Sequence, residues 1–470
     1  MIRNLLLGVS TLALSACAAV GPDYRSPAPE APAQTGFVGA ASPAFTGEEP
    51  AGRWWSLLGD PVLDRLVGQA LAANSDLRVA AANLALARAV LRETRAGRLP
   101  TTSVTSSVTY GRPSGQALGL QGSAGEGATF DAGLDVGYQL DLFGRVRRSI
   151  EASRADLEAV QAAFDVTRIT IAAETTRAYA DACNAGRQLQ VAQESLRVQQ
   201  RTFDLTRRQF EGGRGTALET NQAASLLEVT RAALPTLESQ RRTALYRLAV
   251  LTGRPPAEFP QDVAACATSL ALDRPIPVGS GAGLLARRPD IRQAERQLAA
   301  STARIGVATA DLYPSISLGA SVGSTATSLG GLASGSALRF SLGPLISWSF
   351  PNRSLARARI AQAEASQQAA LARFDGTWLN ALQETESALT NYAGELDRVA
   401  TLRRARAASA EAARVARLRY QAGRESFQIV LDAERSLAQT EASLAQSQAQ
   451  LSTYLITLFL ALGGGWENQG

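Results

Sequence analysis

Two stretches of this chain, 145–211 and 354–421, contain no proline and almost no glycine. In both, apolar or small residues recur at spacings of three, four and seven, which predicts amphipathic α-helices. At 1.5 Å per residue, each helix would be about 100 Å long. A lone helix of that length buries too little apolar surface, so both helices must pack against others in the manner of a coiled coil.

The two stretches belong to a duplicated unit. Asp76 and Asp290 each begin an Ala-rich helical pattern that ends 24 residues later, at Pro100 and Pro314. A second match, offset by 210 residues, pairs Phe210, Gly213, Leu227 and Gly253 with Tyr420, Gly423, Leu437 and Gly463. Each copy is predicted to contain a helix, a strand pair, a very long helix, a tight turn and a return helix.

The predicted organisation has six parts. They are an export signal over 1–16, an N-terminal tail over 17–59, a first repeat over 60–253, a Pro- and Gly-rich connector over 254–283, a second repeat over 284–463 and a C-terminal tail over 464–470. We place the strand pairs at about 100–142 and 314–350, the long helices at about 145–211 and 354–421, and the return helices at about 216–253 and 426–463.

The strand pairs carry an alternation of polar and apolar residues that is clear in the second and fourth strands and weaker, but in phase, in the first and third. It lasts about 10–13 residues, the length of a tilted membrane strand, although a half-buried soluble sheet has the same period. Together with the N-terminal signal described below, the alternation favours a membrane barrel. The polar positions predicted to face its lumen include Asp131, Asp135, Gln139 and Arg339.

Four strands are too few to close such a barrel. The smallest closed membrane barrels use about eight strands. An open edge in lipid would leave N–H and C=O groups unpaired, at several kcal/mol each. The barrel must therefore be shared between copies of the chain, as eight strands in a dimer or twelve in a trimer, and the periodicity does not choose between them.

Composition argues against enzyme chemistry. There is no His or Lys among the 470 residues, so all 47 basic residues are Arg, and there are three Cys and one Met. This excludes the lysine of a phosphate-binding loop, a Schiff base and a histidine general base. We predict no catalytic residues, no metal and no cofactor. The net charge of +5 is spread over helices that also carry 42 acidic residues, so no nucleic-acid partner is expected.

The N-terminus predicts export. Arg3 precedes a short apolar run over 5–14, too short to span a bilayer, which is typical of a cleaved signal. The run leads into Leu14-Ser15-Ala16-Cys17, which resembles a bacterial lipobox with Cys17 as the site of lipid attachment; the alternative is an ordinary signal with a chance cysteine. A multiply acylated Cys17 would anchor the protein stably to the outer membrane. Cys183 and Cys266 are predicted to be separate, buried small residues, although an exported protein can form disulfides.

These features together resemble the TolC-like outer-membrane factors, and more narrowly the NodT/OprM-like lipoproteins of RND efflux systems. The residues that carry the resemblance are Cys17, Gly21-Pro22-Asp23-Tyr24, Trp54-Trp55, Gly59-Asp60-Pro61, Arg288-Pro289-Asp290-Ile291 and Leu312-Tyr313-Pro314. The resemblance implies a mainly α fold with a small membrane β part. Three identical subunits would form a twelve-stranded β-barrel and a twelve-column α-helical barrel, with the tail and the connector at an equatorial collar.

The resemblance also implies a function. The trimer would be a passive export duct across the outer membrane and periplasm, supplied by an inner-membrane RND pump through a periplasmic adaptor. Its gate would lie where the long helices turn back, at Phe210, Gly213, Tyr420, Gly423, Asp432 and Arg435. Gly212, Gly213 and Gly423 would supply the positive φ that a tight reversal needs.

The gate prediction leaves alternatives open. A ring of Asp432 from three subunits would attract cations, but Asp432 could instead be a helix-surface residue paired with Arg435. Ile429 replaces a second aspartate of some relatives, and Glu219 of the first repeat could restore some of the acidity. Competing functions are the exit channel of type I protein secretion and, less in keeping with the duplication, a periplasmic adaptor lipoprotein. The sequence does not identify the exported substrate.

Overall fold

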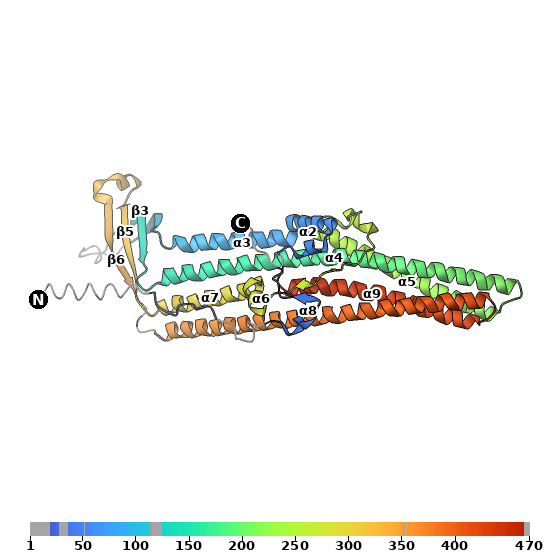
Figure 1. Cartoon of the computed structure of the whole chain (residues 1–470). Coiled ribbons are helices and arrows are strands. Elements are labelled where there is room, and N and C mark those ends of the chain that lie inside the picture. Colours follow the sequence, from blue (N-terminus) through green and yellow to red (C-terminus); the bar gives the residue numbers. More distant parts are fainter. Residues whose placement is uncertain are drawn as a thin grey trace. The chain divides into compact units, whose positions relative to one another are not determined.

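The computed structural model describes residues 19–27, 36–50, 52–112, 114, 125–348, 350 and 353–464. The predicted export signal, Cys17 and the residues after 464 lie outside these ranges. The first half contains α2 (Pro61–Ala73), α3 (Ser75–Ala96), β2 (Thr101–Gly111), β3 (Gly127–Leu140), α4 (Arg145–Glu211) and α5 (Ala217–Leu251) (Figure 1). The second half contains α6 (Gly281–Arg287), α7 (Pro289–Ala310), β5 (Ser315–Ala326), β6 (Leu338–Ser347), α8 (Arg353–Gln421) and α9 (Phe427–Ala461).

The element order repeats. The series α3, β2, β3, α4, α5 returns as α7, β5, β6, α8, α9, and the long helices α4 and α8 have 67 and 69 residues. Both return helices have 35 residues, and α5 continues through Pro235 as one helix. None of the described helices contains an apolar run long enough to cross a membrane.

The chain divides into two compact units, and neither coincides with a sequence repeat. One unit comprises Met1–Pro27, Leu84–Val160 and Gln293–Phe374, and it contains the four-stranded sheet. The other comprises Ala28–Asn83, Gln161–Arg292 and Asp375–Gly470, and it contains both helix turns. Each unit therefore takes residues from both repeats.

The sheet is antiparallel, in the order β2-β3-β5-β6. Its register separates a polar face from an apolar one, because residues directly opposite each other point to the same side. Asp135 lies opposite Ser103 and Ser321, and Ser321 lies opposite Ser341. On the other face Leu134 lies opposite Val104 and Val322, and Val322 lies opposite Phe340. The alternation read from the sequence therefore runs through all four strands.

In the first unit, the segment that follows the predicted lipid site is fastened to the helices. Arg148 on α4 donates to the carbonyls of Val20 (3.1 Å) and Gly21 (3.3 Å) and to the Asp23 carboxylate (2.7 Å). The Tyr24 hydroxyl donates to Glu295 on α7 at 2.9 Å, and burial together with this contact raises the pKa of Tyr24 to about 12. The Gly21-Pro22-Asp23-Tyr24 motif is therefore a docking sequence.

The second unit has the larger apolar core. Trp54 is fully buried and stacks on Phe459 of α9, with ring centroids 4.9 Å apart. Close by, β1 (Phe45–Thr46) pairs in parallel with β4 (Ile276–Pro277), so the N-terminal tail and the inter-repeat connector meet. The Trp54-Trp55 pair packs this region together.

Candidate functional site: the helix turns and the polar sheet face

The first turn joins α4 to α5 through a glycine and a capping box. Gly213 has φ +69°, and the N–H of Arg214 donates to the Gln209 carbonyl at 2.8 Å. The Thr216 hydroxyl accepts from the Glu219 N–H, while the Glu219 carboxylate accepts from the Thr216 N–H at 2.9 Å. The turn is thus defined by local hydrogen bonds that its own residues supply.

The second turn repeats the first 210 residues later. Gly423 also has φ +69°, and the N–H of Arg424 donates to the Arg419 carbonyl at 2.9 Å. Gly213 and Gly423 are therefore the residues that permit the reversals. The matching expectation for Gly212 is wrong, because its φ is not positive.

The two turns contact each other within their unit. The Tyr420 hydroxyl at the end of α8 donates to Gln209 Oε1 at the end of α4, at 2.5 Å. Its ring lies 5.7 Å from that of Phe427 at the start of α9. Burial raises the pKa of Tyr420, and the nearby Glu219 carboxylate raises it further. Tyr420 thus links the first-repeat helix pair to the second.

Asp432 and Arg435 lie on the exposed side of α9. Asp432 accepts from the Gln428 amide at 3.2 Å, and the Arg435 guanidinium lies 3.6 Å from the same carboxylate. In a single chain, Asp432 is therefore a helix-surface residue paired with Arg435, which was the alternative to a gate ring. Glu219 is occupied in the capping box, so its carboxylate already has a structural partner. Phe210 is 47% exposed beside the first turn.

The four predicted lumen residues share the polar face of the sheet. Arg339 on β6 contacts Asp131 on β3 at 2.8 Å, and Thr325 of the intervening β5 donates to Asp131 at 2.6 Å. Asp135 accepts weakly from Thr105 at 3.4 Å. Gln139 lies opposite Ser317, at the end of β3 that leads into α4. The charged pair and the polar residues give this face a water-compatible surface.

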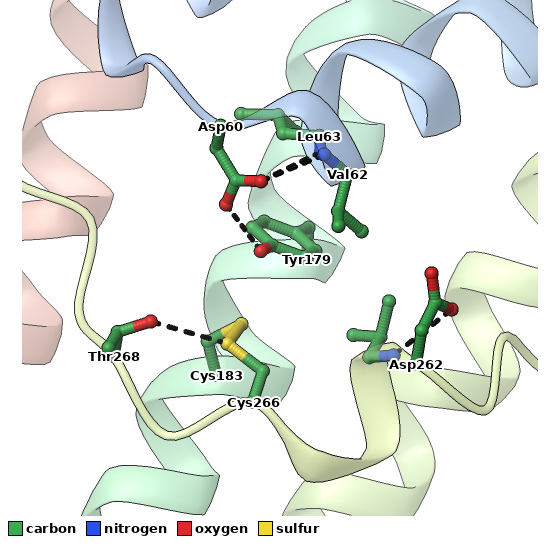
Figure 2. Close-up of a disulfide and its surroundings, with 9 residues drawn as sticks. Asp60, Val62, Leu63, Tyr179, Cys183, Asp262, Cys266 and Thr268 are labelled. Atoms are coloured by element: carbon green, nitrogen blue, oxygen red, sulfur yellow. Dashed lines mark hydrogen bonds between the residues drawn. A yellow bond between two sulfur atoms is a disulfide. The ribbon is translucent and has the colours of Figure 1, made fainter.

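The structure corrects the prediction for the two internal cysteines. Cys183 on α4 and Cys266 in the connector form a disulfide, with their Cα atoms 4.8 Å apart (Figure 2). Nearby, Tyr179 on α4 donates to Asp60, whose carboxylate also caps the start of α2 by accepting from the Val62 N–H (Figure 2). The prediction of separate thiols is wrong because residues 83 apart in sequence are brought together by the fold.

The sequence did not lead us to predict that Glu434 is buried or belongs to the candidate site. Its carboxylate is buried between α4, α8 and α9, and the residue is 1% exposed. A signal was present, because Phe427, Val430, Leu431 and Glu434 follow the i, i+3, i+4, i+7 spacing of one helix face. Three of these four residues are apolar and buried, so the fourth belongs to the same buried side.

The comparisons with known proteins agree with this architecture. A sequence model described as outer membrane efflux protein matches residues 66–254 and 283–464, which fall on the two repeats. The chain is 30% identical to Nodulation protein T of Rhizobium leguminosarum bv. trifolii, over 97% of this chain and 96% of that protein. It is 30% identical to the probable outer membrane lipoprotein SilC of Salmonella typhimurium, over 99% and 100% of the two chains. The solved structure of the outer-membrane channel OprN has a TM-score of 0.90 and 37% sequence identity, covering 96% of this chain and all of that one.

The duplicated helices, the paired turns and the two-faced sheet are those of an outer-membrane channel. This chain belongs to the outer membrane efflux protein family. The resemblance to the NodT/OprM-like group and the mainly helical, duplicated fold that it implied are both confirmed. The family is one of export channels and is not an enzyme family.

Proposed function

We propose that this chain is one of three identical subunits of the exit duct of an RND-type tripartite efflux system. In this proposal an inner-membrane pump and a periplasmic adaptor deliver the substrate, and the duct carries it passively through the outer membrane. In this proposal the pump selects the substrate, and the duct does not. The composition agrees with this, because the chain has no His or Lys and a single Met with which to bind a substrate specifically.

The observation that carries the proposal is the apolar face of the sheet, which no described part of the chain covers. Val104, Phe340 and Leu342 are each more than 80% exposed in the single chain. Leaving three large apolar side chains in water costs about 1.5–3 kcal/mol each relative to burial. Lipid would cover this face, while neighbouring copies would pair the free edges of β2 and β6. The polar face with Asp131, Asp135, Gln139 and Arg339 would then line the lumen.

The lipid anchor is the second part of the proposal. Cys17 precedes the docked segment that begins at Val20, so its acyl chains would be tethered within a few residues of the Arg148 contacts. The likeness to SilC, whose name is probable outer membrane lipoprotein, supports the same assignment. Mass spectrometry of the mature protein would test it, because an unmodified Cys17 contradicts the anchor.

The gate is the third part. Gly213 and Gly423 make the reversals, Phe210 and Tyr420 flank them, and Asp432 with Arg435 stands on the return helix. Three copies of Asp432 around the axis would concentrate cations at the constriction. The surface pairing of Asp432 with Arg435 in one chain is compatible with such a ring, because both side chains remain more than half exposed.

Planar bilayer recordings on the purified full-length protein test the function. We expect discrete, cation-preferring conductances from a species with the mass of a trimer. Asp432→Ala is expected to raise single-channel conductance and weaken cation preference, whereas Glu411→Ala, at an exposed carboxylate on α8, should change neither. A protein that stays monomeric and forms no channels would contradict the duct, and an unchanged Asp432→Ala channel would contradict the gate ring. A deletion strain that loses protein secretion instead of efflux would favour the type I alternative.

A further inference from the structure

The buried carboxyl group of Glu434 joins the two repeats close to the turns. The Thr202 hydroxyl on α4 lies 3.1 and 3.0 Å from the two carboxylate oxygens, and it donates to one of them at a time. The Arg417 guanidinium on α8 lies 3.5 Å from one of the same oxygens. One side chain on α9 therefore contacts both long helices.

The residues around Glu434 are mostly apolar, so its carboxyl group depends on these hydrogen-bond partners. Phe427, Val430 and Leu431 of α9 pack in one apolar cluster with Ala223 of α5 and Ala416 of α8, while Phe203 of α4 is partly buried against it. A carboxyl group at such a site loses its hydration, so it is tolerated only while its hydrogen-bond partners are in place. Separation of α9 from α4 would remove the Thr202 hydroxyl and admit water to Glu434.

The duplication does not repeat this contact. With the 210-residue offset, Glu434 corresponds to Ala224 on α5, and Thr202 corresponds to Ala412 on α8. Arg417 corresponds to Arg207, so the arginine is present in both copies. The carboxyl and its hydroxyl donor thus mark the junction between α4 and α9, and the corresponding positions on α8 and α5 lack both groups.

We propose that Glu434 is a gate-positioning residue, which fastens the α8–α9 pair to α4 and so holds the helix turns in their constricted arrangement. The inference rests on the proposed function, in which these turns are the gate. Glu434 affects the gate by holding the helices in place. Asp432 and Arg435 remain the side chains that face the solvent.

The junction also has a predictable response to pH. Burial raises the pKa of Glu434, and the contacts with Thr202 and Arg417 offset part of that rise. The charged group that faces it is Arg417 on α8, while α4 contributes the Thr202 hydroxyl and α5 contributes Ala223 to the cluster. A carboxyl exposed by opening returns to its ordinary pKa, so the constricted state binds the proton more tightly. Low pH therefore favours constriction, and this contribution is lost as the pH rises through the raised pKa.

The test compares bilayer conductance of wild type, Glu434→Ala, Glu434→Gln and Thr202→Val between about pH 5 and 8. Glu434→Ala should raise the open probability about ten-fold at the acidic end of this range and flatten its pH profile. Glu434→Gln, which keeps an acceptor for Thr202 but does not titrate, should hold the channel constricted at every pH. Thr202→Val should open it as Glu434→Ala does, and it keeps the test available if Glu434→Ala does not assemble.

The control is Glu411→Gln, the same chemical change at an exposed pair with Arg414 on α8, which should behave as wild type. If all Glu434 and Thr202 variants conduct like wild type with an unaltered pH profile, the inference is overturned while the duct stands. If wild type itself forms no channels, the proposed function fails first. These two failures are therefore distinguishable.

Discussion

Gly186 lies against the backbone carbonyl of Cys266 so closely that a Cβ added to Gly186 would be 2.1 Å from that oxygen. Gly186 is the single glycine of the 67-residue helix α4. One turn earlier on the same helix, Cys183 forms the disulfide to Cys266. The connector is thus fastened to α4 by a covalent bond and by a close backbone approach that a glycine permits.

Gly186→Ala should therefore destabilise the protein even though alanine is the better helix former. Displacing the connector backbone is expected to cost about 1–3 kcal/mol, as overpacking does elsewhere in protein cores. Denaturant unfolding of the purified protein measures the change. The matched control is Gly394→Ala in α8, where no described neighbour lies within 4 Å of the added Cβ, and there a gain of up to about 1 kcal/mol is expected. Equal effects at both positions would contradict the close approach.

Removing the disulfide should loosen the same attachment. Cys183 and Cys266 are 83 residues apart, so the bond restricts a long loop in the unfolded chain. Cys183→Ser with Cys266→Ser is expected to lower the free energy of unfolding by about 2–5 kcal/mol. Thiol labelling of the denatured, unreduced wild type is the direct check. Labelling at both positions without reductant would show that the bond is absent from the mature protein.

Arg288 is expected to be needed for packing beneath the end of α9. Its guanidinium donates to Asp290 (2.7 Å), to Glu384 (2.9 Å) and to the Ala461 carbonyl (2.8 Å), and the residue is 8% exposed. Arg288→Met leaves a carbonyl and two carboxylates without this donor, and should cost about 2–4 kcal/mol. Arg231→Met, which breaks an exposed pair with Glu228, should cost less than about 1 kcal/mol in the same unfolding experiment. If both variants lose the same free energy of unfolding, the burial of the Arg288 contacts adds nothing to the stability of the protein.

The sequence predicted the elements whose signal is local. The ends of α4 and α8 follow from unbroken helical periodicity, and the two faces of the sheet follow from the alternation around Asp131 and Asp135. Gly213 and Gly423 could be assigned because a reversal between two helices needs a residue with positive φ.

The parts that could not be predicted depend on the tertiary structure. Cys183 and Cys266 are 83 positions apart, and nothing in the sequence between them indicates that they meet. The spacing of Glu434 from Phe427 indicates the helix face on which it lies, but its partners Thr202 and Arg417 depend on how α9 packs against α4 and α8. Glu219 resembles a carboxylate free to line a gate, but the local capping box uses it. Cys183 and Glu434 thus gained partners that only the folded chain supplies, whereas the capping box of Glu219 is local and the spacing from Thr216 to Glu219 could have predicted it.

The docking of the N-terminal segment is expected to depend on pH through Glu295. Burial raises the pKa of this carboxyl, but the contacts from Arg296, Ser26 and Tyr24 outweigh burial and hold the pKa below its ordinary value of 4.5. A lowered pKa in the docked state means that the stabilisation is complete above about pH 4.5 and is lost as the pH falls through the lowered value. The protection factors of residues 19–27, taken relative to the intrinsic exchange rate at each pH, should therefore fall on acidification, while those of the α4 core stay high. Glu295→Gln should have lower protection factors than wild type at neutral pH and show little further change in acid. Protection that is the same in both proteins at every pH would show that Glu295 does not hold the segment.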